Sequence, residues 1–142
     1  MNGKAIFNYP AWFIGWALLC LLSGISLGIW FMTPMGGDLS LLVSHVHVNL
    51  FGWVTLTLYG LIHNAFPDLA HRRLARCQFV CAVLGGICLP LGFGLSRELP
   101  FHKLVIGLGA ASGAIAALLF AVMFAGLLND RNPTLIKTGT PR

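Results

Sequence analysis

Four long stretches without a charged side chain constrain this chain more than any other feature. Lys, Arg, Asp and Glu are absent from residues 5–37, 39–67, 77–96 and 104–129. Each stretch reaches the length of about 20 residues that an α-helix needs to cross the hydrocarbon core of a bilayer. Only 9% of the 142 residues are charged, whereas soluble domains carry about 25%. The sequence therefore predicts an all-α integral membrane protein, a four-helix bundle in the lipid bilayer.

The predicted helices account for nearly all of the chain. We expect them near residues 12–32, 40–66, 77–95 and 101–128, in a single four-helix transmembrane domain with a polar tail at 129–142. The loops between them are short and leave no room for a soluble module. No pattern of interleaved aromatic and basic residues suggests a nucleic-acid partner.

The basic residues predict the orientation in the membrane, because loops rich in Lys and Arg stay in the cytoplasm. Only Arg97 and Lys103 fall on one side of the predicted topology. The other side carries seven basic residues: Lys4, Arg72, Arg73, Arg76, Arg131, Lys137 and Arg142. We therefore expect a multi-pass protein of a bacterial-type inner membrane with both termini in the cytoplasm.

Two histidines inside the second predicted helix are the first candidate functional residues. Ionisable side chains at membrane depth are costly and mark functional sites. His45 and His47 lie in the stretch SHVHVNLFGW, one and a half to two turns from the outer end of this helix. Two residues span about 200° around an α-helix, so the two rings cannot share one metal ion in ordinary helical geometry. Either each ring meets a separate partner, or one ring has a function and the other is incidental. The interpretation without a ligand is that both are satisfied polar residues in a helix interface.

A neutral imidazole nitrogen is a good ligand for iron, copper or zinc. In an apolar bundle the natural large partner is haem, which needs axial ligands and a slot bordered by small and apolar residues. Asn49 stands four residues after His45 and could orient a ligand ring or a propionate. Gly52 and Gly60 could leave room beside the helix, and Trp53 adds an apolar wall. The pattern indicates a haem-binding site.

His63 is a weaker ligand candidate near the other end of the same helix. It follows His45 by 18 residues, which is five turns and the same face of a straight α-helix. One interpretation places a second haem there, with His102 and His71 as outer and inner partners. The other lets the ring of His63 reach the membrane boundary.

The stretch HVHVNLFGWVTLTLYGLIHNAFP, 23 residues in all, resembles a histidine-bearing helix of the haem–copper oxidase catalytic subunit. The pair His45 and His47 is similar to the family helix whose two histidines ligate two different haems. The run from His47 to Leu50 is similar to an H-x-N-L segment of the C-family oxidases and nitric oxide reductases. The histidine of that segment binds the low-spin haem. The other helices match only in being apolar.

The catalytic subunit of that family has twelve helices in three arcs of four, with metal ligands on the second helix of each arc. The resemblance implies that this chain corresponds to one arc and forms a homotrimer, a twelve-helix assembly. Each interface would then bind one haem b between His45 of one chain and His47 of the next. The implied function is electron transfer with a redox partner that the sequence does not identify.

The chain departs from the family at the copper site. That site uses a pair of adjacent histidines near a tyrosine, and no such pair occurs here. Tyr59 follows His47 by twelve residues, about 18 Å along a helix. Copper is therefore less expected than haem b, and a haem with two axial histidines has no open position for a substrate. A minimal oxygen or nitric oxide reductase, and a non-redox metal-handling or oxidase-assembly protein, stay open as alternatives.

Overall fold

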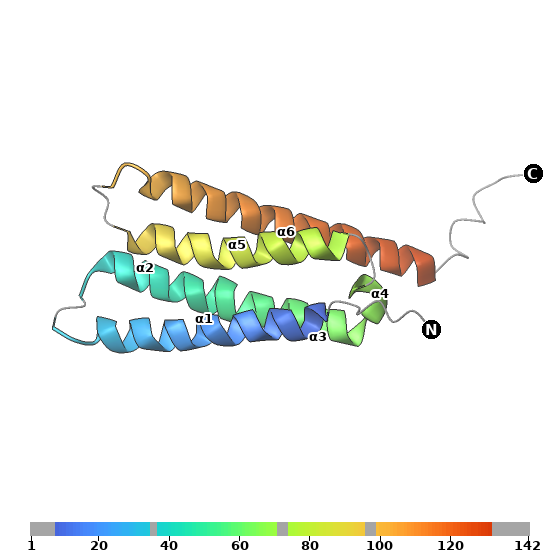
Figure 1. The fold of residues 1–142 in the computed structure, drawn as a ribbon, viewed down its shortest axis with the longest axis horizontal. Helices are drawn as coiled ribbons and strands as arrows, with labels where there is room; N and C mark the ends of the chain where they lie inside the picture. Colours follow the sequence, from blue (N-terminus) through green and yellow to red (C-terminus); the bar gives the residue numbers. More distant parts are fainter. Residues whose placement is uncertain (1–7, 35–36, 71–73, 96–98, 132–142) are drawn as a thin grey trace, which may run out of the picture.

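The computed structural model describes residues 8–34, 37–70, 74–95 and 99–131, and every element in them is helical (Figure 1). The elements are α1 (Tyr9–Phe31), α2 (Leu39–His47), the π-helix η1 (Val48–Thr55), α3 (Leu56–Ala65), α4 (Pro67–Ala70), α5 (Leu74–Gly94) and α6 (His102–Arg131). The segments α2, η1 and α3 follow one another without a break. We call this continuous rod helix 2 (Leu39–Ala65).

Four helices of the described chain are long and apolar enough to cross a membrane: α1, helix 2, α5 and α6. The prediction of a multi-pass, all-helical membrane protein is confirmed for the described residues. The helix ends differ from the expected positions by one to three residues. Helix α6 continues to Arg131 and so includes the first three residues of the predicted tail. The rest of the tail lies outside the described residues, as do most of the basic residues used for the topology.

Side-chain caps start two of the helices. The side chain of Asn8 accepts a hydrogen bond of 3.3 Å from the backbone N–H of Ala11 at the beginning of α1. Asp38 accepts one of 2.9 Å from Ser40 N–H at the beginning of α2. Each cap satisfies a backbone donor that has no partner within the first helical turn. The two caps therefore define where α1 and α2 begin.

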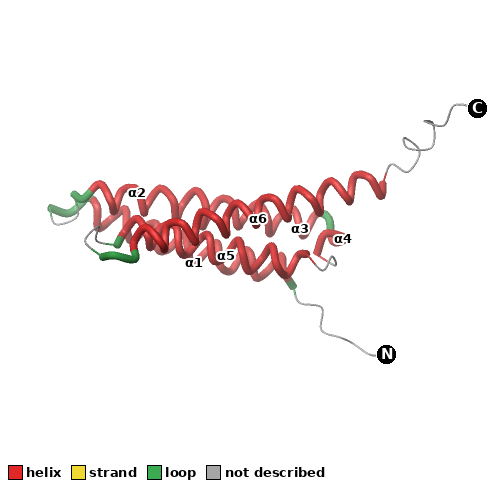
Figure 2. Tube along the Cα trace, turned by 90° about the horizontal axis from the view of Figure 1, so that it is seen from above, coloured by secondary structure: helices red, strands yellow, loops and turns green. Residues whose placement is uncertain are grey.

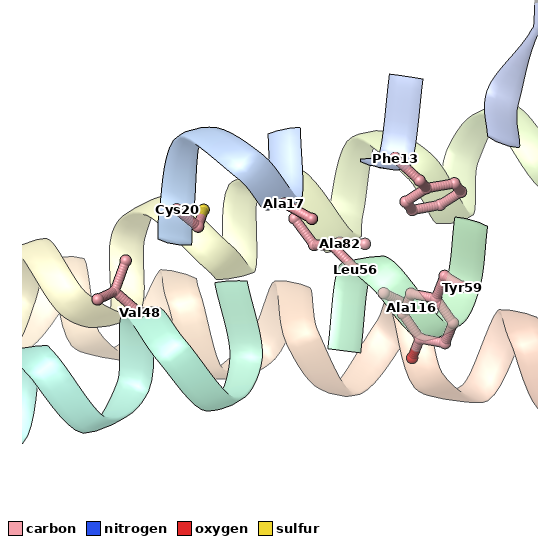
Figure 3. Packing of buried hydrophobic residues seen from close by; sticks show 8 residues of the cluster. All are labelled: Phe13, Ala17, Cys20, Val48, Leu56, Tyr59, Ala82 and Ala116. Carbon is pink, nitrogen blue, oxygen red and sulfur yellow. The ribbon is translucent and has the colours of Figure 1, made fainter. Parts of the chain in front are cut away.

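The interior of the bundle is narrow and contains many small side chains. One buried cluster draws on all four long helices, and Figure 3 shows its members meeting between them: Phe13, Ala17, Cys20, Val48, Leu56, Tyr59, Ala82 and Ala116. Large aliphatic side chains point outward instead, among them Ile29 and Leu118, each 66% exposed. Because lipid tails are as apolar as these side chains, the hydrophobic effect does not favour burying them between the helices. Small residues in the interior let the helices approach closely.

Glycines bring α5 and α6 into backbone contact. A Cβ added at Gly109 would lie 2.5 Å from the backbone nitrogen of Leu89, and one at Gly92 would lie 2.8 Å from that of Ile106. Gly113 of α6 faces the ring of Phe51 from η1. Helix 2 therefore touches the α5–α6 pair on one side while it packs along α1 on the other.

The described chain begins and ends at the same end of the bundle (Figure 1). The short helix α4 lies at this end as well (Figure 2). Its Leu69 belongs to a second buried cluster, together with Ala75, Met123 and Leu127. The connection between α1 and α2 lies at the opposite end (Figure 1). His45 and His47 lie in α2 and therefore belong to that opposite half of the molecule.

Candidate functional site

His45 sits in a notch formed by two glycines of α1. Its Nδ1 lies 2.9 Å from the carbonyl oxygen of Gly24. Because a carbonyl oxygen can only accept, Nδ1 carries the proton and donates it, and Nε2 of the neutral ring keeps a free lone pair. A Cβ added at Gly28 would lie 2.9 Å from Cε1 of the ring. These glycines, one turn apart, are what allows the imidazole to lie against α1.

Asn49 completes this contact between helix 2 and α1. Its Nδ2 donates a hydrogen bond of 2.8 Å to the backbone carbonyl of His45. The same nitrogen approaches Nδ1 of His45 at 3.4 Å. Both of these atoms are donors, so the approach is not a hydrogen bond. A Cβ at Gly24 would lie 2.5 Å from the Asn49 amide. Asn49 therefore supports His45 through its backbone and through packing, not through a direct bond to the ring.

His47 lies against a different helix. Its Nδ1 donates to the carbonyl oxygen of Val43, one turn earlier, at 2.8 Å. Its ring packs on that of Phe93 in α5, with 4.6 Å between the ring centroids. The structure thus places the two imidazoles beside separate neighbours, which is one of the alternatives that the spacing of two residues leaves open. Among the described residues, neither ring has a hydrogen-bond partner at Nε2.

An exposed row of aliphatic side chains runs along helix 2 between the two half-buried rings. We call it the aliphatic stripe; its members are Leu42, Val46, Leu50, Val54 and Leu58. Val46, which separates the histidines in sequence, is 47% exposed. His45 and His47 therefore occupy opposite flanks of one outward-facing surface.

The expected room beside Gly52 and Gly60 does not exist, so this part of the sequence interpretation is wrong. A Cβ at Gly52 would lie 2.8 Å from Sγ of Cys20, and one at Gly60 would lie 2.9 Å from Cγ1 of Ile14. Side chains of α1 fill both notches. Trp53 is partly buried and packs against the central buried cluster. These residues serve helix packing and do not border a slot next to the histidines.

The π-helix changes the face on which His63 lies. In a straight α-helix, residues 18 apart share a face, yet here the two buried polar positions Ser44 and His63 are 19 apart. A π-turn contains one extra residue, which rotates everything beyond it by about 100°. The side chain of Thr55 follows this pattern, since it donates to the carbonyl of Leu50, five residues earlier. The expected shared face of His45 and His63 is therefore wrong.

His63 is fully buried inside the bundle, so its ring is not exposed at the surface of the described chain. Its Nε2, the atom that a second haem would need, lies 2.9 Å from Oε1 of Gln78 in α5. The ring of Phe13 stacks on its imidazole at 5.5 Å. The interpretation with a second haem on the face of His45 thus loses its geometric basis.

Sequence reasoning missed Gly24 and Gly28, although the signal was present. The two glycines form a small-xxx-small pair in the first predicted helix, the pattern that favours close helix contact. Gln78 and Phe93 gave no comparable signal, because neither belongs to a recognisable motif. Only the three-dimensional packing of α5 against helix 2 places Gln78 beside His63 and Phe93 beside His47.

Within the described residues, no three His, Cys, Asp or Glu side chains lie close enough to hold a metal ion. A groove of about 420 Å³ lies between α1, helix 2 and α5, and a smaller cavity of about 220 Å³ is lined by Phe93 and His102. Neither His45 nor His47 lines either space. These two spaces are therefore not where the imidazole of His45 or His47 would meet a ligand. Comparisons of the chain with protein families, with curated proteins and with solved structures give no match.

Proposed function

We propose that this protein binds haem b in the membrane and transfers electrons, with His45 and His47 as axial ligands. One observation carries the proposal: both rings donate Nδ1–H to a backbone carbonyl and keep Nε2 free. Histidines that ligate metals have this arrangement, because the second hydrogen bond fixes the tautomer and the orientation of the ring. His63 does not have it, since its Nε2 is bonded to Gln78.

The imidazole nitrogens of His45 and His47 can ligate one haem only if they come from two neighbouring copies of the chain. The rings flank the aliphatic stripe on opposite sides, so one chain does not offer both nitrogens to one iron. A closed ring of identical subunits brings the His45 flank of each chain against the His47 flank of the next. The resemblance of residues 45–67 to an oxidase helix favours three subunits, which together have twelve helices.

Haem b held by two imidazoles supplies one-electron transfer without an open coordination position. The chain itself contributes orientation and a dry surface. Gly24 and Val43 hold the two rings through their carbonyl oxygens. The aliphatic stripe offers the apolar wall that a haem macrocycle requires. Copper is a weaker candidate, because the sequence has no pair of adjacent histidines such as the oxidase copper site uses.

The proposal includes an orientation in a bacterial-type inner membrane. The seven basic residues of one side favour cytoplasmic termini under the positive-inside rule. His45 and His47 then lie in the outer half of the bilayer, opposite the end at which the described chain begins and ends. Electrons would be exchanged with a redox partner near that outer surface.

A spectrum of the detergent-purified protein tests the proposal. We expect haem b, with sharp bands in the reduced protein that split at low temperature, as six-coordinate low-spin haem gives. His45→Ala and His47→Ala should each lose the haem. His102→Ala is the matched control, since His102 also donates Nδ1–H to a backbone carbonyl, that of Leu99, at 2.8 Å; this variant should keep it.

Haem retained in both His45→Ala and His47→Ala would refute the ligand assignment. A wild-type protein that contains no haem would refute the proposed cofactor. A broad high-spin spectrum that shifts with carbon monoxide would point instead to an open coordination site and to a minimal oxygen or nitric oxide reductase.

A further inference from the structure

The groove of about 420 Å³ between α1, helix 2 and α5 has no part in the proposed haem site, since neither candidate ligand lines it. One end of the groove lies beside Leu27 and Leu95, at the end of the bundle where α1 connects to α2. The other end lies beside Trp16 and Gly86, in the middle third of α1 and of α5. Trp16 and Leu27 are 11 residues apart, so the groove is about 16 Å long.

The groove opens toward lipid. Its rims include Leu19 of α1 and Leu91 of α5, whose side chains are 55% and 57% exposed. Helix 2 forms the floor, where Ser44 and Val48 are buried. Because all three helices are long and apolar enough to cross a membrane, a hydrocarbon chain of the bilayer can enter the groove sideways without leaving the membrane.

The chemistry of the lining favours an apolar occupant. Ser23 and Ser44 carry its two hydroxyl groups, and each donates to a backbone carbonyl oxygen, at 2.9 Å and 2.6 Å respectively. The other described lining residues are apolar, apart from the thiol of Cys20 and the indole of Trp16, and none is charged. A bound water molecule needs about two to four polar partners, and a buried charge needs a partner of opposite charge. The lining supplies neither.

We propose that this groove binds one acyl chain of a membrane phospholipid, which enters from the leaflet at the end where α1 connects to α2. The hydrocarbon core of a bilayer is about 30 Å thick, so one leaflet contributes about 15 Å. The groove has this length and stops where such a chain ends. A partner helix that crosses the membrane would need a groove through the whole depth of the bundle. The length therefore favours a lipid chain over a second protein.

A bound chain differs from the lipid that merely surrounds the protein, which contacts side chains in proportion to their exposure. Ile87 lines the groove and is only partly exposed. Leu108 of α6 does not line it and is 54% exposed. The two residues lie at a similar depth, because Gly109 faces the backbone of Leu89. A chain held in the groove should therefore contact Ile87 more often than Leu108.

Photolabelling of the full chain in phosphatidylcholine bilayers tests the proposal. The probe is a phosphatidylcholine with a diazirine near the middle of one acyl chain, present as a trace component. Mass spectrometry then measures the label at each residue. We expect several-fold more label at Ile87 than at Leu108. Label that follows exposure, with Leu108 at or above Ile87, overturns the proposal.

Two variants of α1 form a matched pair. Ser23 and Ser26 are both exposed, and each donates to the carbonyl oxygen one turn earlier at 2.9 Å, but only Ser23 lines the groove. Ser23→Phe places a ring in the groove and should abolish the excess label at Ile87, whereas Ser26→Phe should preserve it. An undiminished excess in Ser23→Phe contradicts the site. If Ser23→Phe does not fold, the wild-type comparison of Ile87 with Leu108 still decides.

A second probe identifies the source of the chain. An isoprenoid quinone with a diazirine on its tail replaces the phospholipid probe in the same bilayers. This probe should label Ile87 no more than Leu108, and an excess at Ile87 overturns the assignment to a phospholipid. Protein without haem should give the same phospholipid labelling, because neither candidate ligand lines the groove. The site is therefore tested separately from the haem.

Discussion

The imidazole Nδ1–H of His45 donates a hydrogen bond of 2.9 Å to the carbonyl oxygen of Gly24. This bond joins helix 2 to α1 at one of the two proposed haem ligands. The contact depends on the absence of a side chain at Gly24, since the Asn49 amide occupies that space. The orientation of the His45 ring therefore depends on the close packing of helix 2 against α1.

A methyl group at Gly24 should destabilise the bundle. In Gly24→Ala the new Cβ would lie 2.5 Å from the Asn49 amide, and such overpacking costs about 1–3 kcal/mol. The higher helix propensity of Ala offsets about 1 kcal/mol of this cost. Gly15→Ala in the same helix is the control, because a Cβ there meets nothing within 4 Å. Thermal unfolding in detergent should show a lower midpoint for Gly24→Ala and an equal or higher one for Gly15→Ala.

Removing the Asn49 amide should rescue the Gly24 variant. Asn49→Ala alone loses the 2.8 Å bond to the carbonyl of His45 and should lower the unfolding midpoint. In Gly24→Ala/Asn49→Ala the clash is gone, so the two changes should couple by at least about 0.5 kcal/mol in a double-mutant cycle. Strictly additive effects would show that the two side chains do not compete for the same space.

Deleting one residue of the π-helix should be tolerated. The deletion of Val54, an exposed residue of η1, converts the wide turns to ordinary α-helix and keeps both ends of helix 2 in their packed orientation. The deletion of Leu58, exposed in α3, should instead rotate the chain beyond it by about 100° and abolish folding. Circular dichroism and size-exclusion profiles distinguish the two. Equal damage from both deletions would speak against a localised extra residue in η1.

The buried hydroxyl of Ser44 should contribute to stability. It donates a hydrogen bond of 2.6 Å to the carbonyl oxygen of Pro90 in α5. Loss of a hydrogen bond between membrane helices costs about 0.6 kcal/mol on average and up to about 1.7. Ser44→Ala should therefore lower the unfolding midpoint by a few degrees. Ser26→Ala, which loses an exposed bond within its own helix to Leu22, should have no measurable effect.

The sequence was sufficient to predict the four long helices, because a bilayer tolerates few spanning structures and residues 39–67 could hardly be anything else. It also predicted that the rings of His45 and His47 point in nearly opposite directions, since both lie in the regular α2 segment, where the spacing of two sets the angle. These are properties of local geometry, which periodicity describes directly.

The inward position of His63 could not be predicted in this way. Periodicity assumes one helical pitch, and the π-helix η1 shifts the register of everything after it. Gly52 and Gly60 show a second limit. A glycine in a helix indicates close approach, but only the packed structure shows that Cys20 and Ile14, and not a cofactor, fill the space.

Haem binding by a mixture of two ligand variants tests the central claim most directly. The claim is that each haem takes His45 from one chain and His47 from its neighbour. His45→Ala and His47→Ala, expressed separately, should bind no haem. Co-expressed in equal amounts, they should recover about a quarter of the wild-type haem per chain, because that fraction of the interfaces in a randomly mixed ring pairs the two intact histidines. Recovery near that level supports shared ligation, and a mixture as empty as the single variants contradicts it.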